Sequence, residues 1–221
     1  MTTMLNPTPT DAAPEKPKMR GWIHFVAFIL ILTLSGFLLS QTDSVSQAIY
    51  VTIYLFSIAA MFGTSALLHL KNWGEVGRRR MRRADHSTIF LAIAGSYTAI
   101  AGLALTGWHR VAMLSLAWGG AVIGVIVRQV LLDAPKWLIA IPYVVVGWSS
   151  LLFLPALVDS LGIWGFMGVL GGGLAYTAGA IFYAAKRPNP IPGVFGYHEL
   201  FHACTVLGAG LHLAVVWSIL A

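Results

Sequence analysis

The stretch FGYHELFHACTVLGAGLHLAVVWSIL, residues 195–220, predicts a helix that spans a membrane. About 20 helical residues cross a hydrocarbon core of about 30 Å, and this stretch is longer than that. Glu199 is its only residue with a formal charge at pH 7 when histidines are neutral. Two histidines, His198 and His202, flank this glutamate. A membrane-spanning helix here would therefore carry ionisable side chains, which are usually functional at membrane depth.

The whole chain has the composition of an integral membrane protein. Of its 221 residues, 57% are hydrophobic and 10% are charged, and the mean hydropathy is +0.77, whereas an ordinary soluble domain carries roughly 25% charged residues. Lipid offers no partner for free backbone groups, so the spans must be helices. The prediction is an all-α fold, an integral membrane seven-transmembrane helical bundle. The apolar windows behind it are 21–40, 45–70, 84–107, 111–132, 136–156, 161–185 and 195–220.

The N-terminal residues differ from the rest of the chain. Residues 1–20 are polar and contain four prolines, so they predict a short disordered cytoplasmic tail. A cleaved signal peptide is not expected, because its apolar core would be about 7–15 residues long. Residues 21–221 then form one seven-helix transmembrane domain. Cys204 is the only cysteine, so no disulfide is expected within the chain.

The positive charges predict the orientation. With seven spans, 13 of the 14 Lys and Arg residues fall on one side, and only Arg110 falls on the other. The positive-inside rule then places the N-terminus in the cytoplasm and the C-terminus outside the inner (plasma) membrane. The same rule accounts for the basic run at 78–83, so no nucleic acid is expected as a partner. This run could also attract anionic lipid headgroups.

Ionisable side chains within the spans point to a metal site near the cytoplasmic side. His69 lies at the inner end of the second span, Asp85 at the inner start of the third, and His198 and His202 at the inner start of the seventh. Residues four apart share one helix face. Three histidines with a nearby carboxylate suit Zn²⁺, whereas magnesium or calcium would need an oxygen-rich site. Iron or another transition metal stays open on ligand type alone.

Three spaced motifs carry a resemblance to a known family. SALLH at 65–69, RRADHSTIFLAIAGSYT at 82–98 and YHELFH at 197–202 resemble the signatures of the hemolysin III group of the progestin and adiponectin receptor (PAQR) family, which includes a bacterial membrane-homeostasis branch. The motifs occur in the family's order. The resemblance covers nearly all of the chain after the tail, and it implies the same seven spans with a cytoplasmic N-terminus.

The resemblance also implies roles for particular residues. It implies that His69, His198 and His202 bind zinc. It implies that Asp85 reaches the metal through water, with Ser65 beside the site. The family has no fixed glutamate within its His-x-x-x-His motif, so the role of Glu199 must be argued from this chain.

Two interpretations of Glu199 are open. His-Glu-Leu-Phe-His matches the H-E-x-x-H pattern of zinc metalloproteases, in which the glutamate is a general base. A third ligand downstream is hard to find, because no Asp or Glu follows His202 and His212 lies about 280° around the helix from it. We therefore favour Asp85 as the base. Glu199 then lies in the first turn of its helix, where the helix dipole favours a negative charge.

Other polar residues have simpler explanations. His24 and His109 lie near span ends, where interfacial or solvated roles are the default. Side chains such as His86 and His212 are expected to pack or to hydrogen-bond within the bundle. Cys204 is about 200° around the helix from His202, so we expect it to face away from the metal as a small apolar filler.

Two functions from different classes fit this sequence. The first is a zinc-dependent hydrolase of lipid amide or ester bonds, with ceramidase-like chemistry, in which Asp85 is the base and Ser65 helps to hold the water or oxyanion. The second is a receptor-like or regulatory membrane sensor with a structural zinc. A cytolysin ranks third, because the chain shows no amphipathic toxin segment. Membrane lipids are the expected partners, whereas the substrate or ligand and the oligomeric state stay open.

Overall fold

The computed structural model describes residues 16–130 and 135–221. The regular elements of that part of the chain are α-helices and one 3-10 helix, so the predicted all-α fold is confirmed. The predicted tail, residues 1–20, and the end of the window 111–132 lie partly outside the described residues. The elements in chain order are α1 (Trp22–Ser40), α2 (Val45–Leu70), α3 (Glu75–Ala104), α4 (Gly107–Val130), α5 (Lys136–Trp148), η2 (Ser149–Phe153), α6 (Leu154–Ala185) and α7 (Tyr197–Leu220).

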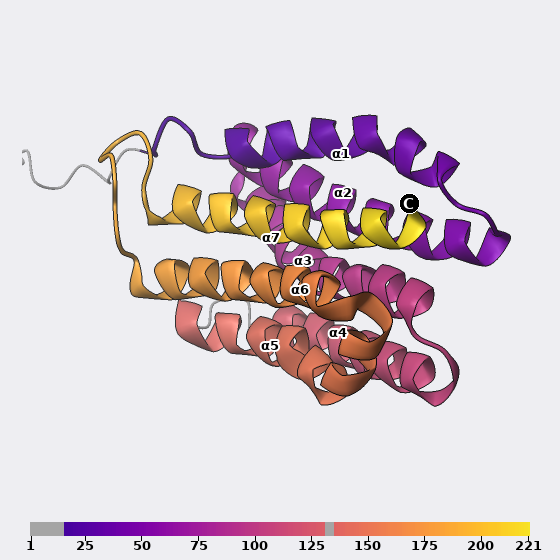
Figure 1. Cartoon of the computed structure of the whole chain (residues 1–221). Coiled ribbons are helices and arrows are strands. Elements are labelled where there is room, and N and C mark those ends of the chain that lie inside the picture. The colour runs from indigo at the N-terminus through magenta and orange to yellow at the C-terminus, as the bar shows by residue number, and fades with distance from the viewer. Residues whose placement is uncertain (1–15, 131–134) are drawn as a thin grey trace, which may run out of the picture.

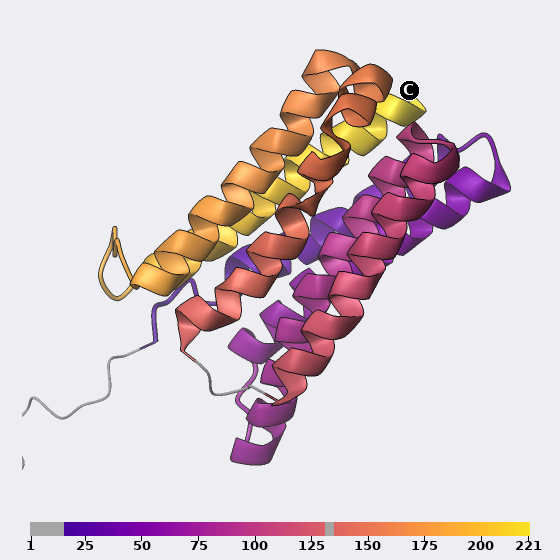
Figure 2. The same cartoon turned by 90° about the horizontal axis from the view of Figure 1, so that it is seen from below.

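The described helices make this a multi-pass membrane protein. Six helical stretches among these residues are long and apolar enough to cross a membrane. The windows predicted at 136–156 and 161–185 fall largely within one of them, Ala140–Ala185. Inside it Gly162 has φ 65° and ψ 175°, a conformation that glycine adopts and other residues rarely do. Figures 1 and 2 show the chain turning back in this region, so that most of α6 runs antiparallel to α5.

Helix α3 packs against helices beyond its two neighbours in the sequence. It contacts α2, α4, α5, α6 and α7. Its buried face is rich in small residues such as Ala94, Gly95 and Ala99, which allow neighbouring helices to approach closely. A Cβ at Gly95 would lie 1.9 Å from the Ser57 hydroxyl of α2. The close contact of α2 and α3 brings their polar side chains together at one end of the bundle.

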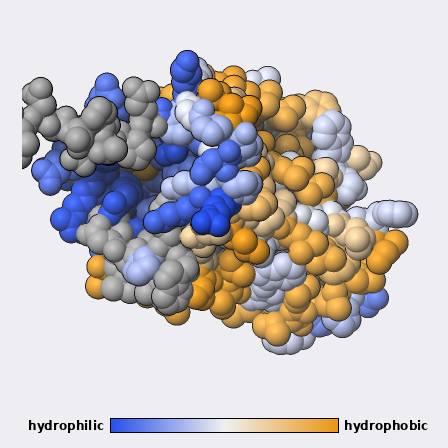
Figure 3. Space-filling view, turned by 90° about the vertical axis from the view of Figure 1, so that its left-hand side faces the viewer, coloured by the Kyte–Doolittle hydropathy of each residue, from blue (hydrophilic) through white to orange (hydrophobic). Residues whose placement is uncertain are grey.

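The outer flanks of the bundle are apolar. Val26 and Leu30 of α1 are 54% and 55% exposed, and Ile123 and Ile126 of α4 are exposed to a similar degree. Figure 3 looks onto the end that lies at the left of Figure 1, where hydrophilic side chains gather beside hydrophobic flanks. Apolar flanks next to a hydrophilic end suit a helical bundle surrounded by lipid.

Helices α6 and α7 approach each other at glycines. A Cβ at Gly172 would lie 2.3 Å from two ring atoms of His212 and 3.2 Å from the Gly208 carbonyl oxygen. The His212 ring is held in place, because its Nε2 donates to the Val169 carbonyl at 3.2 Å. Cys204 packs against Gly179 in the same interface, where an added Cβ would lie 2.9 Å from the cysteine Cβ.

We expect Gly172→Ala to destabilise the bundle, because overpacking a well-filled interface typically costs about 1–3 kcal/mol. Gly173→Ala is the matched control, since a Cβ there meets no atom within 4 Å. Alanine is also preferred over glycine in a helix by about 1 kcal/mol, so the control should be neutral or stabilising. Thermal unfolding of both variants in one detergent gives the comparison. Equal unfolding midpoints would contradict a tight α6–α7 interface.

Candidate metal centre

Three histidines from two helices converge at one end of the bundle. His69 lies in the last turn of α2, and His198 and His202 lie in the first two turns of α7. One potential ligand atom from each lies within 4.8 Å of the other two. The ring centroids are 4.8 Å apart for His69 and His198, 5.2 Å for His69 and His202, and 4.7 Å for His198 and His202. The three residues that the sequence singled out as ligands therefore lie together.

This donor set suits a transition metal. A tetrahedral zinc with Zn–N distances of about 2.0–2.1 Å needs ligand nitrogens about 3.3 Å apart, which small side-chain rotations can reach from the spacing seen here. His202 is 1% exposed, and its Nδ1 has no hydrogen-bond partner among the described residues. A buried ring nitrogen without a partner is costly. A metal bound at this position would supply the missing partner.

Asp85 and Ser65 lie beside the three histidines but are not part of the ligand group. Ser65 is buried on α2, one turn before His69, and its side chain lies close enough to the Asp85 carboxyl of α3 to favour the carboxylate. The hydroxyl oxygens of Thr64 and Thr88 lie 2.9 Å apart and join the same two helices. Asp85, Ser65 and His202 line one cavity. The carboxyl is therefore oriented by a neighbouring helix and faces the space next to the histidines.

Both carboxylate oxygens of Glu199 contact groups other than the three histidines. Its side chain is fully buried, its Oε2 accepts from the Gly196 amide at 2.9 Å, and its Oε1 is paired with the Arg20 guanidinium. The Gly196 contact caps the first turn of α7, where a carboxylate is favoured by the free amides and the helix dipole. Both oxygens have protein partners. This arrangement favours a capping role over that of a metalloprotease base.

Residues 16–19, just before α1, form hydrogen bonds at the end of the bundle that holds the histidines. The amides of Lys18 and Met19 donate to the carbonyls of Gly193 and Val194 at 3.1 and 3.2 Å. The Lys16 ammonium donates to the His69 carbonyl. Partial burial, together with the charges of Arg20 and Arg78, lowers the pKa of the Lys16 ammonium. The residues just before α1 are thus attached to the end of α2 and to the segment that leads into α7.

Gly21 allows α1 to start close to the histidines. Its φ is 91°, which favours glycine over residues with a side chain. A Cβ at this position would lie 2.8 Å from the Cβ of His69. The backbone therefore passes against α2 and enters α1 directly beside the candidate metal centre.

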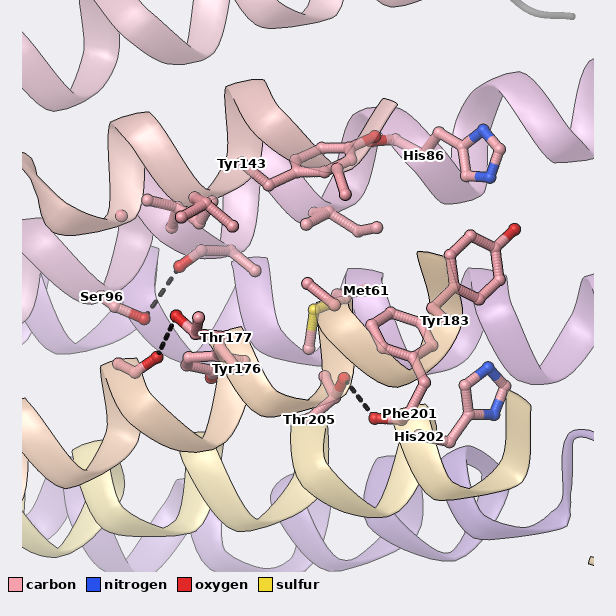
Figure 4. Close-up of a pocket in the computed structure, with 18 of the residues that line it drawn as sticks. Met61, His86, Ser96, Tyr143, Tyr176, Thr177, Tyr183, Phe201, His202 and Thr205 are labelled. Carbon is pink, nitrogen blue, oxygen red and sulfur yellow. Dashed lines mark hydrogen bonds between the residues drawn. The ribbon is translucent and has the colours of Figure 1, made fainter. Parts of the chain in front are cut away.

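A cavity of about 150 Å³ opens beside the histidines into the bundle. Figure 4 shows His86, Tyr183 and His202 toward one end of it and Ser96, Tyr176 and Thr177 toward the other, with Met61 and Phe201 between them. Apolar walls with a few converging polar groups are typical of small-molecule sites. A molecule with an apolar chain and a polar head matches this lining.

Comparison with known proteins agrees with the three sequence motifs. The sequence profile described as "Haemolysin-III related" matches residues 13–213. The chain belongs to the haemolysin-III related family. Hemolysin-3 of Bacillus cereus is 29% identical over 167 residues, which are 76% of this chain and 74% of that protein. The Hemolysin-3 homolog of Bacillus subtilis (strain 168) is 26% identical over 189 residues, which are 84% of this chain and 85% of that protein.

In this haemolysin-III related chain, sequence reasoning missed two polar side chains near the centre. His24 was expected at the interface, but it is 3% exposed and stacks on His202, with ring centroids 3.8 Å apart and ring planes 12° apart. Arg128 entered the sequence analysis only as one of the 13 positive charges on one side, but it is 4% exposed in the last turn of α4, and its Nε donates to the Nδ1 of His86 at 2.8 Å. The only sequence signal for either residue was its position just inside the end of a predicted span.

The contact with Arg128 sets the orientation of His86. Because the guanidinium only donates, Nδ1 of His86 is an acceptor in this contact. The Tyr143 hydroxyl donates to the His86 carbonyl at 3.0 Å and joins α5 to the same point of α3. His86 follows Asp85 in the chain, so these contacts hold the turn of α3 that carries the carboxyl.

Proposed function

We propose that this protein is a zinc-dependent hydrolase of lipid amide or ester bonds, with ceramidase-like chemistry, that acts in membrane lipid homeostasis. The observation that carries the proposal is the cavity beside the three histidines, with the Asp85 carboxyl and the Ser65 hydroxyl in its wall. The apolar part of the lining suits an acyl chain, and the polar end suits the amide or ester group. Membrane lipids offer both parts in one molecule.

In this proposal His69, His198 and His202 hold the zinc ion. When bound, the metal would polarise a carbonyl and make a water more acidic. Two neutral histidines on adjacent turns of α7 and one from α2 leave room for a fourth ligand, as catalytic zinc sites do. Structural zinc sites are usually closed by four protein ligands, and the ligand group found among the described residues has three.

Asp85 is the general base. Its carboxylate accepts a proton from the water that adds to the substrate carbonyl, and this proton passes to the departing amine or alkoxide as the C–N or C–O bond breaks. The products are a fatty acid and an amine or alcohol. Ser65 lies next to the Asp85 carboxyl and favours its charged form. Arg128 and Tyr143 keep the adjoining turn of α3 in place through His86.

We further propose seven membrane crossings with a cytoplasmic N-terminus and the histidines near the cytoplasmic side. The break at Gly162 supports the crossing count, because it divides the longest stretch into two runs. The distribution of 13 of 14 Lys and Arg residues supports the orientation. A reporter fused after Ala221 should be active only outside the cytoplasm, and one inserted between Lys71 and Glu75 only inside. Reversed signals would place the histidines near the other face.

The first functional test concerns the metal. Purified protein should contain about one zinc per chain, and His69→Ala, His198→Ala and His202→Ala should each remove most of it, because each replacement takes away one of three ligands. Asp85→Ala should weaken zinc affinity by about 10–100-fold, as loss of a supporting residue does. Elemental analysis of the purified variants gives the measurement. His212→Ala is the control, and a comparable zinc loss there would contradict the ligand assignment.

The second functional test concerns hydrolysis. We expect the purified protein to release fatty acid from N-palmitoylsphingosine or a phospholipid ester. Asp85→Asn should keep the fold and lower kcat by about 10²–10⁴-fold, because the side chain stays similar in size but no longer accepts the proton. Mass spectrometry of the lipid products gives the rates.

Glu199→Gln is the matched control for this test, since it makes the same chemical change next to the ligands and should leave most activity. The opposite pattern, an inactive Glu199→Gln with full zinc and a nearly normal Asp85→Asn, would support the metalloprotease interpretation. A zinc-loaded protein that hydrolyses no lipid substrate would instead favour a regulatory membrane protein with a structural zinc.

A further inference from the structure

His24 is a buried polar side chain whose ring nitrogens make no hydrogen bond of ordinary geometry. It is 3% exposed, and among the described residues only the backbone of His202 lies near a ring nitrogen, outside that geometry. An uncharged imidazole carries one donor and one acceptor nitrogen, so both kinds of hydrogen bond are left unmade. Buried polar groups normally find partners, and an exception calls for an explanation. The unused nitrogens of His24 suggest a ligand that the ring contacts.

The position of the ring narrows the possible ligands. His24 lines the same cavity as Ser65, Asp85 and His202, and its ring is packed between two others. One face stacks on His202 at 3.8 Å, and Phe62 lies 5.0 Å away by ring centroids. His24 enters the site from α1, a helix that supplies none of the three grouped histidines.

The stacked arrangement argues against His24 as a ligand of the same metal ion. An imidazole nitrogen binds a metal in the plane of its ring, at about 2.0–2.1 Å for zinc. The planes of His24 and His202 are only 12° from parallel and are separated by a stacking distance. Two rings stacked in this way do not direct their nitrogens at one common point. His24 therefore lies beside the group of three histidines, in the wall of the cavity, rather than within that group.

We infer that His24 binds the polar head of the lipid, hydrogen-bonding to the carbonyl or carboxylate oxygen that lies beside the three histidines. This inference rests on the proposed function and adds a substrate-binding residue to it. The N–H of His24 donates to that oxygen, while its ring face keeps His202 in position. The chemical class recognised is an acyl compound, namely an amide, an ester or the fatty acid released from either.

Two substitutions distinguish the hydrogen bonding of the His24 nitrogens from the stacking of its ring. His24→Phe keeps an aromatic ring that can stack on His202 but has no polar atom. The replacement His24→Asn keeps a donor and an acceptor but has no ring. His109→Phe is the matched control, because it makes the same change at an exposed histidine in the first turn of α4. Zinc content of each full-length variant is measured first, because loss of metal would change binding indirectly.

Palmitate is the probe, and hexadecane, which has the chain without the head, is the reference. The zinc-loaded protein in detergent should bind palmitate about 10–100-fold more weakly after His24→Phe, since a hydrogen bond to a charged group is lost. Hexadecane binding and zinc content should be unchanged. His24→Asn should recover part of the palmitate affinity, and His109→Phe should behave as wild type.

The outcomes distinguish the proposed role of His24 from the proposed lipid hydrolase function. If wild type binds palmitate and His24→Phe binds it equally well, the role of His24 is wrong and the proposed function stands. If His24→Phe loses zinc as His69→Ala does, His24 supports the metal rather than the lipid, and the inference is again wrong. If wild type with full zinc binds neither palmitate nor hexadecane, the lipid site itself fails, and both proposals fail with it.

Discussion

Hydrocarbon offers no partner to a polar side chain, and the histidine end of this bundle is arranged around that constraint. Four imidazoles lie together there, from α1, α2 and α7. Each ring that is removed from water must gain a hydrogen bond, a metal or a ligand, or else destabilise the fold. Membrane proteins keep ionisable groups at such depth mainly where they serve a function. The grouping of these rings is what the proposed metal centre requires.

The same constraint explains the contacts of the charged groups nearby. Glu199 is buried within the first turn of α7 and is balanced by Arg20 and by the amide of Gly196. Arg128 is buried at the end of α4 and donates to His86. Removing the partner of a fully buried charge is strongly unfavourable. Glu199→Gln is milder, because it removes the buried charge itself and leaves that of Arg20, whose side chain is 18% exposed. These contacts fix the turns that carry His198 and Asp85, so the charged residues position the site without belonging to the ligand group.

Much of the fold and part of the site could be predicted from the sequence. The apolar windows and the spacing of His198 and His202 depend on local periodicity, which a single chain displays. His69 was found because it ends the SALLH motif at the end of the second predicted span. His24 was misjudged because α1 is apolar on all sides, so periodicity does not tell which face is buried. The pair of Arg20 and Glu199 joins residues far apart in the chain, and no local pattern predicts such a contact. The helical boundaries around Gly162 were also approximate, because the apolar run continues through the break.

The attachment of the segment before α1 to the start of α7 affects how the protein is made. A ribosome delivers Arg20 and His24 to the membrane first and Glu199 and His202 last. Until α7 is inserted, the first helix has neither its ion pair nor its stacking partner, and α2 presents His69 alone. The site therefore assembles only after the last helix has been synthesised. A chain truncated before α7 would expose its unpaired polar groups to the lipid and to the proteases that remove incomplete membrane proteins.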